Sequence, residues 1–170
     1  KIIREFILGA KRAKAAGADG VELHAAHGYL IQQFLSPYTN QRTDEYGGSF
    51  DKRMKFLLDI LKGIKAECGK DFPVIVRLSV DECYKEIGRE GVGYTLPDGV
   101  RMAKIIEEIK TKGIGCIFYE ADGESKIAES VAKECGIRTA PLNPFEGDAK
   151  GRDYFSVMEE NLEYLEQGLK

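Results

Sequence analysis

Segments with a helical spacing of apolar residues alternate along this chain with short runs of β-branched residues. The clearest strand, Val74–Val80, follows Pro73 and is rich in valine and isoleucine, which predicts a strand buried on both faces. The segment before it places five apolar residues on one helical face: Phe56, Leu57, Ile60, Leu61 and Ile64. Strands that alternate with helices pair in parallel through helical crossovers, so the pattern predicts an α/β protein with parallel strands and flanking helices.

The same patterns locate the other elements. Further helices are expected at residues 2–13, 97–112, 125–135 and about 152–168. Short strands are expected at 21–24, 116–119 and 139–142, and the four strands could form one open sheet. Helix 125–135 is expected to bury Ile127, Ala128, Val131 and Ala132. The last helix has one apolar stripe, formed by Phe155, Met158, Leu162 and Leu165. Residues 36–50 and 81–96 are expected to form long loops, which in compact domains usually serve function.

Composition excludes several classes of partner. The 170 residues have a net charge of −3, which argues against nucleic acid, and no apolar run approaches the roughly 20 residues of a membrane span. The four cysteines lie far apart without a C-x-x-C pair: Cys68, Cys83, Cys116 and Cys135. Together with the absence of a secretory leader pattern, these thiols predict a reduced, cytoplasmic protein that binds neither nucleic acid nor membrane.

The first chemical constellation is the run His24-Ala-Ala-His27-Gly-Tyr29 at the end of a predicted strand. Two imidazoles can donate hydrogen bonds to one carbonyl oxygen, and a nearby phenol can protonate the adjacent carbon. H-x-x-H is also a metal-pair spacing, but no carboxylate or thiolate at a fitting offset supports it, so no metal ligand is predicted. Histidines without any role remain the plain alternative.

The second constellation is Arg77, which stands in the middle of an apolar strand. A guanidinium there must face a carboxylate or an anionic ligand, because burying an unpaired charge is costly. One interpretation is a cation at the end of the strand that stabilises a reduced, anionic cofactor ring. The other is an ion pair within the sheet, for example with Glu22 on the neighbouring strand.

Residues from about 6 to 106 resemble the Old Yellow Enzyme family of flavin-dependent ene-reductases, especially its bacterial branch. Two segments match in register, GADGVELHAAHGYLIQQFLSPYTNQRTDEYGGSFDKRMKFLLDI and FPVIVRLSVDE. The resemblance implies a partial (β/α)8 TIM-barrel segment of about two and a half βα units, with FMN at its carboxyl face. It also implies a structural loop formed by Arg42, Asp44, Tyr46, Gly47, Gly48 and Arg53. Lys52 departs from the family pattern, which usually has Asn before this Arg.

The same resemblance implies roles for the two constellations. His24 and His27 would bind the carbonyl oxygen of an α,β-unsaturated substrate, an enone or enoyl compound, and Tyr29 would donate the proton. Arg77 would lie beside the flavin, and reduced FMN would deliver hydride to the β-carbon after its own reduction by NAD(P)H.

The barrel is incomplete, because a whole one needs about 250 residues. The early strands and the last two strands, whose loops bind phosphate in many such barrels, are missing. A chain that retains FMN and one that has lost it are both compatible with the sequence. Unpaired strand edges would also allow a homo-oligomer.

Residues from about 109 to 170 resemble the C-terminal part of the zinc/manganese-binding solute-binding proteins of ABC transporters. The matching runs are IFYE, SKIAE, LNPFEG and YFSVMEENL, in that order. Glu120 matches a strand-end carboxylate, whereas Asn143 stands where some members have a metal-binding Asp, and an amide is a poorer zinc ligand. The family's metal-binding histidines come from earlier segments that this chain lacks, so no competent metal site is expected, and Glu120 and Glu146 are expected to be solvated carboxylates.

The chain therefore looks like a hybrid, with a partial flavin-oxidoreductase barrel at 1–108 and an α/β tail at 109–170. Three functions follow: an FMN-dependent oxidoreductase of the ene-reductase type, a metal-binding solute-binding module, and an inactive α/β scaffold.

Overall fold

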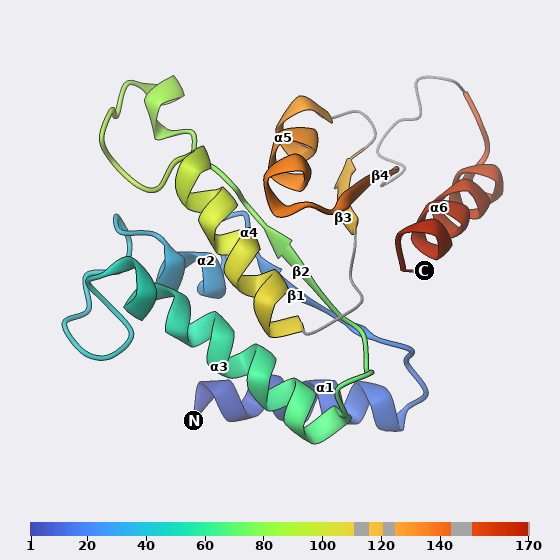
Figure 1. The fold of residues 1–170 in the computed structure, drawn as a ribbon. Coiled ribbons are helices and arrows are strands. Elements are labelled where there is room, and N and C mark those ends of the chain that lie inside the picture. Colours follow the sequence, from blue (N-terminus) through green and yellow to red (C-terminus); the bar gives the residue numbers. More distant parts are fainter. Residues whose placement is uncertain (111–115, 121–124, 144–150, 170) are drawn as a thin grey trace. The chain divides into compact units, whose positions relative to one another are not determined.

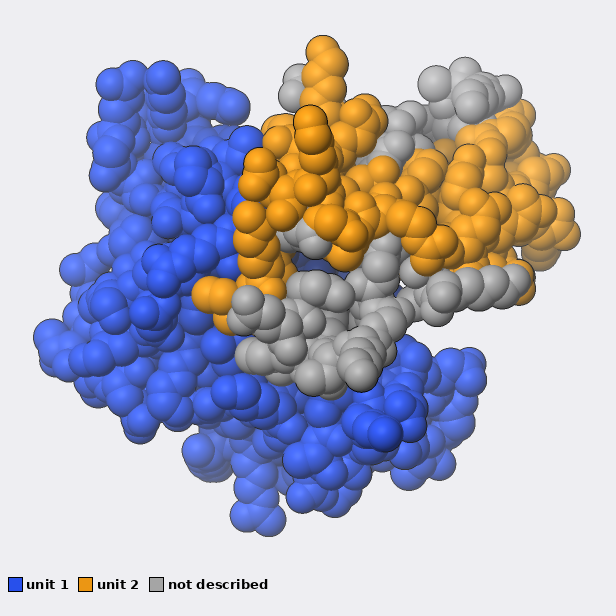
Figure 2. All heavy atoms as spheres, in the orientation of Figure 1, with its two compact units in different colours: residues 1–102 blue, residues 103–170 orange. Residues whose placement is uncertain are grey.

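The chain divides into two compact units, Lys1–Met102 and Ala103–Lys170, which Figure 2 colours separately. The computed structural model describes residues 1–110, 116–120, 125–143 and 151–169 (Figure 1). The division between the units falls inside a helix, α4. The domain boundary after residue 108 stays a prediction.

The order of elements follows the predicted alternation of helices and strands. The first unit contains α1 (Ile2–Ala15), β1 (Val21–Ala25), α2 (Leu30–Leu35), α3 (Phe50–Cys68), β2 (Val74–Leu78), the 3-10 helix η1 (Tyr84–Ile87) and the start of α4 (Leu96–Lys110). The second contains the rest of α4, β3 (Cys116–Glu120), α5 (Ser125–Cys135), β4 (Arg138–Leu142) and α6 (Tyr154–Leu169). The short helices α2 and η1 were not predicted, because neither is long enough to show helical periodicity.

The strands are parallel, which confirms the α/β class. β1 pairs with β2 in the register Val21↔Val74 to Ala25↔Leu78, and β3 pairs with β4. The expectation of one four-stranded sheet is wrong: the described strands form two separate two-stranded sheets. Each sheet joins two consecutive strands linked by a helical crossover within one unit, and this is the common pairing for neighbours in sequence.

The core of the first unit forms around α3. All five residues of its predicted apolar face are buried, which confirms that part of the prediction. Figure 1 shows α1 and α3 side by side, and the two helices are in contact. On the strands, Leu23, Ala25 and Val74 are buried and lie on one face of the sheet, because side chains alternate between faces.

The opposite face of this sheet remains open to solvent, so the expected burial of β2 on both faces is wrong. Arg77 is exposed and Ile75 is only half-buried, although Val74 is fully buried. Glu22 and His24 occupy the same open face of β1. This face is where the polar side chains of both strands gather.

In the second unit, α6 packs on β4 through a different stripe from the one expected. Val157 is fully buried, whereas Phe155 is 76% and Leu162 is 59% exposed. The reason is a pair of hydrogen bonds that orients the helix: Asn161 accepts from the main-chain N–H of Asn143 (2.8 Å) and donates to its carbonyl (2.7 Å). Asn161 and Val157 are one helical turn apart, so the face they share turns toward the strand.

Helix α5 also differs in detail, since Ile127 is 38% exposed while Val131 and Ala132 are buried as expected. Among the described residues, no helix combines the length and the apolar character that crossing a bilayer requires.

Candidate active site

The chain makes an unusual turn immediately after β1. His27 and Gly28 both adopt left-handed backbone conformations, with φ of +56° and +75°. Glycine reaches this region without cost, but a residue with a Cβ is uncommon there. The turn brings Tyr29, at the start of α2, back toward the end of β1.

The turn gathers three of the predicted site residues. The ring centroids of His24 and His27 are 5.0 Å apart, and those of His24 and Tyr29 are also 5.0 Å apart. His24 is half-buried, His27 is exposed, and Tyr29 is 62% exposed. Two imidazoles and a phenol therefore share one small, solvent-accessible region at the carboxyl end of β1.

Arg77 lies on the neighbouring strand on the same side of the sheet. It is the register partner of His24, and paired residues of adjacent strands point to the same face. Its Nε donates to Glu22 Oε1 at 2.8 Å, which confirms the predicted ion pair. Both side chains are nearly half exposed, and such pairs contribute at most about 1 kcal/mol to stability. The pair thus leaves Arg77 accessible on the face that holds His24.

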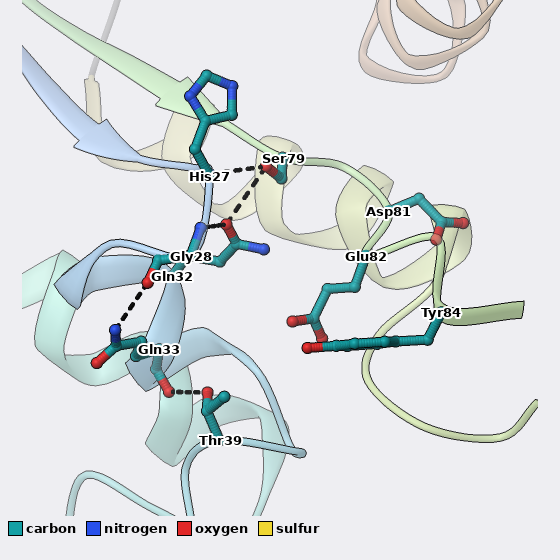
Figure 3. A pocket seen from close by; sticks show the side chains of 9 residues that line it. All are labelled: His27, Gly28, Gln32, Gln33, Thr39, Ser79, Asp81, Glu82 and Tyr84. Carbon is teal, nitrogen blue, oxygen red and sulfur yellow. Dashed lines mark hydrogen bonds between the residues drawn. The ribbon is translucent and has the colours of Figure 1, made fainter. Parts of the chain in front are cut away.

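A cavity of about 350 Å³ opens next to the turn (Figure 3). Its lining contains His27 but not His24, Tyr29 or Arg77; it is formed by His27, Gly28, Gln32, Gln33, Thr39, Ser79, Asp81, Glu82 and Tyr84. In Figure 3 the imidazole of His27 points away from the other labelled side chains. The cavity and the cluster of rings are therefore on different sides of the turn.

The cavity is acidic, and its two carboxylates organise the loop after β2. Asp81 accepts hydrogen bonds from the main-chain N–H groups of Cys83 (2.7 Å) and Leu96 (3.0 Å). Glu82 Oε2 accepts from the Ser36 hydroxyl (2.8 Å) and from the main-chain N–H of Tyr94 (2.9 Å). Burial, reinforced by the charge of Glu82, raises the pKa of the Tyr94 phenol far above its usual range.

The open strand face offers Arg77 as a donor for the ring edge of a flavin. Arg77 uses Nε for Glu22, and a guanidinium has further N–H donors for an anionic ring edge. A phosphate needs cations or converging N–H groups, whereas the neighbouring cavity presents Asp81 and Glu82. Arg77 would therefore hold the ring edge of FMN, whereas the acidic cavity does not fit its phosphate.

The long loop before α3 is held by its own polar residues. Asn40 is buried and donates to the carbonyls of Phe34 (2.6 Å) and Tyr46 (2.7 Å), and Arg42 forms an ion pair with Asp44. The Arg42 guanidinium lowers the pKa of the Asp44 carboxyl. These contacts are consistent with the structural role that the family resemblance implies for this loop.

Sequence reasoning did not single out the residues that fix the turn and line the cavity, notably Gln32, Ser79 and Glu82. Ser79 directly follows the end of β2, so a search of strand carboxyl ends would have found it. Nothing in the spacing of Gln32 distinguishes it from an ordinary helical residue.

In the tail, Glu120 is the last residue of β3 and Asn143 follows β4, whereas Glu146 lies outside the described residues. Within the described ranges, no group of three or more His, Cys, Asp or Glu side chains is arranged to hold a metal ion.

Polar side chains gather at the carboxyl ends of the parallel strands, which is where α/β proteins usually bind their ligands. Residues 1–117 match the model of the NADH:flavin oxidoreductase / NADH oxidase family, and the chain belongs to this family. The family implies FMN as the cofactor and NAD(P)H as the reductant. A second model, zinc-uptake complex component A (periplasmic), matches residues 86–168, and so both resemblances found in the sequence are confirmed.

Two similar proteins are far longer than this chain. The NADH oxidase of Thermoanaerobacter brockii is 52% identical over 108 residues, which is 64% of this chain and 16% of that protein. The cinnamate reductase of Clostridium sporogenes is 42% identical over 113 residues, 61% of this chain and 17% of that protein. The chain thus spans about a sixth of the length of either relative.

A solved structure extends the similarity to the fold. The 2-naphthoyl-CoA reductase in complex with 2-naphthoyl-CoA matches with a TM-score of 0.65 and 32% identity, over 83% of this chain and 22% of that one.

Proposed function

We propose that this chain provides the substrate-binding and proton-donating residues of an FMN-dependent oxidoreductase of the ene-reductase type. The observation behind the proposal is the convergence of His24, His27 and Tyr29 at the end of β1, with Arg77 on the same face of β2. Relatives named cinnamate reductase and 2-naphthoyl-CoA reductase support a small unsaturated carbonyl compound, an enone or enoyl thioester, as the substrate.

Each residue of the cluster has a distinct part in this chemistry. N–H groups of His24 and His27 donate hydrogen bonds to the substrate carbonyl oxygen and stabilise the negative charge that develops on it. The Tyr29 hydroxyl then donates a proton to the carbon next to the carbonyl. Bound FMN would supply the hydride for the β-carbon, with NAD(P)H as the reductant. Arg77 offers its remaining N–H donors to the anionic ring edge.

The finer architecture belongs to the same proposal. We infer that β1 and β2, with the helices that follow them, are consecutive units of a partial (β/α)8 barrel of about two and a half βα units. The open face of the sheet, with Glu22, His24, Ile75 and Arg77, corresponds to the inner face of such a barrel. A homo-oligomer through the sheet edges and a cytoplasmic location stay predictions.

The experiment uses the purified full chain supplied with FMN, NADH or NADPH, and 2-cyclohexenone, with the saturated ketone measured by gas chromatography. Tyr29→Phe should lower the turnover by roughly 10²- to 10⁴-fold, the usual contribution of a positioned proton donor. Tyr38→Phe is the matched control, because Tyr38 lies outside the ring cluster and the cavity lining. Equal turnover in the wild type and Tyr29→Phe would refute the assignment of the proton donor.

A second candidate, a metal-binding module of the ABC-transporter type, has support from the family match over residues 86–168. Calorimetric titration with zinc separates the two functions, since only the second predicts stoichiometric heat. Cooperative unfolding with neither zinc nor FMN binding would leave the third possibility, an inactive α/β scaffold.

A further inference from the structure

We propose that Gln32 is a positioning residue, whose amide oxygen holds the His27–Gly28 turn and thereby keeps the rings of His24, His27 and Tyr29 together. The claim that these rings are held together in order to bind substrate rests on the proposed function. The geometric claim can be tested without flavin or substrate.

The main-chain groups of the turn form hydrogen bonds with side chains of α2 and with Ser79, which follows β2 (Figure 3). The N–H of Gly28 donates to Gln32 Oε1 at 2.7 Å, and the N–H of His27 donates to Ser79 Oγ at 3.3 Å. The Gly28 carbonyl accepts from Gln33 Nε2 at 2.7 Å. Three polar main-chain groups of the turn therefore have side chains as hydrogen-bond partners.

Such support matters because the turn is conformationally costly. A left-handed conformation at His27 places its Cβ close to backbone atoms, and a residue other than glycine does not hold this conformation without compensation. Main-chain groups without partners would add a further cost. If the side-chain acceptors are removed, His27 is expected to relax toward an ordinary backbone conformation, which would carry its imidazole away from His24.

Gln32 contacts both the turn, through Gly28, and Ser79 at the end of β2. It is buried in α2, and its Oε1 also accepts a longer hydrogen bond from the Ser79 hydroxyl, at 3.4 Å. Ser79 is itself anchored, because the buried Tyr94 donates its hydroxyl proton to the Ser79 carbonyl at 2.9 Å. The Gln32 oxygen thus fixes the turn after β1 relative to the end of β2, the strand that contains Arg77.

Two variants of similar size separate the acceptor from the shape of the side chain. Gln32→Met keeps the approximate volume and removes the acceptor, whereas Gln32→Glu keeps an acceptor oxygen at the same position. Gln41→Met is the control: Gln41 Nε2 donates to the carbonyls of Pro37 and Tyr38, so this change also removes glutamine hydrogen bonds, but away from the turn.

The measurements are made by NMR on the full chain without FMN. Nuclear Overhauser contacts report the His24–His27 and His24–Tyr29 ring proximities, and hydrogen exchange reports the Gly28 amide. Gln32→Met should lose the ring contacts and speed Gly28 exchange by about fivefold to tenfold, the effect of one typical hydrogen bond. Gln32→Glu should restore the contacts, and Gln41→Met should leave both signals unchanged.

A folded Gln32→Met variant with wild-type ring contacts would overturn the proposal. If Gln32→Met does not fold, Gln32→Asn decides instead, since it keeps a polar amide but is one methylene shorter, which withdraws its oxygen from the Gly28 N–H. Lost ring contacts in folded Gln32→Asn then support the proposal, and retained contacts overturn it. Because no flavin is present, these outcomes are independent of whether the proposed oxidoreductase function holds.

Discussion

At the scale of single residues, Arg53 shows how one half-buried cation connects two parts of the first unit. Its Nε donates to the carbonyl of the buried Leu35 at 2.8 Å, and its Nη1 donates to the carbonyl of Gly48 at 2.6 Å. Burial lowers the pKa of this guanidinium. The side chain thus ties the end of α2 and the loop before α3 to the first turn of α3.

Replacing Arg53 by Met should therefore destabilise the fold. The change keeps the apolar stem but leaves a buried carbonyl without its donor, which costs about 1–3 kcal/mol. Urea unfolding followed by circular dichroism measures the loss as a lower midpoint at constant slope. Lys52→Met, at the exposed neighbouring position, should change stability by less than about 0.5 kcal/mol. Similar losses in the two variants would contradict the contacts described for Arg53.

Cys83 offers a prediction about pH. Desolvation raises the pKa of its thiol, and the charges of Asp81 and Glu86 act in the same direction. Because the folded state holds the thiol proton more tightly than the unfolded state, the protonated thiol favours folding below the ordinary thiol pKa. This contribution to the free energy of unfolding is lost as the pH rises through the folded-state pKa. Iodoacetamide labelling, quantified on the Cys83 peptide by mass spectrometry, should have its midpoint at higher pH in the folded chain than in urea.

Glu86→Gln removes one of the charges that disfavour the thiolate, so it should shift the labelling midpoint of folded Cys83 to lower pH. Glu90→Gln, on the same loop, is the control and should leave the midpoint unchanged. If the pH midpoint of Cys83 labelling in the folded chain were at or below the midpoint in urea, the proposed raising of the thiol pKa by its surroundings would be wrong.

At the scale of elements, two helical glycines make opposite predictions. A Cβ at Gly99 in α4 would lie 2.1 Å from the Val80 carbonyl oxygen and 2.6 Å from its Cα, so the helix could not keep its place beside the end of β2. A Cβ at Gly9 in α1 would meet nothing within 4 Å. Gly99→Ala should destabilise the protein by about 1–3 kcal/mol. Gly9→Ala should stabilise it by about 0.5–1 kcal/mol through lower chain entropy. Thermal unfolding of both variants tests the pair, and a shift of the same sign in both would refute the close approach at Gly99.

The elements also show what patterning can predict. The buried face of α3 follows from apolar periodicity alone, because hydrophobic burial dominates there. The same reasoning chose the wrong stripe on α6, where Asn161 binds the main chain of Asn143 and turns Val157 inward while Phe155 stays exposed. Periodicity identifies apolar stripes, but a specific polar contact can decide which stripe packs.

Part of the candidate site could also be predicted from the sequence, because that part depends only on local patterns. His24, His27 and Tyr29 are close in sequence, so a turn after a strand is enough to bring them together. The link from Gln32 to Ser79 spans 47 positions and depends on the pairing of β1 with β2, which local patterns do not specify. The pairing of Arg77 with Glu22 was predictable, since both are charged residues on adjacent predicted strands.

At the scale of the whole molecule, the chain combines a family match over residues 1–117 with a second match over 86–168, and it folds as two compact units. The residues proposed for substrate binding and proton donation all lie in the first unit. Its parallel strands present His24 and Arg77 on the open face, and the turn after β1 adds His27 and Tyr29. Because these side chains are accessible to solvent, whether this chain itself binds flavin decides between the proposed functions.

The most direct test is the FMN affinity of the full chain, measured by the change in flavin fluorescence on titration. The account predicts saturable binding that is weakened at least about tenfold in Arg77→Met, the loss expected when a charged hydrogen bond is removed. Arg101→Met is the control, because Arg101 forms an exposed ion pair with Asp51 on other elements and should leave the affinity unchanged. A folded chain without saturable FMN binding, or an Arg77→Met variant with wild-type affinity, would contradict the account.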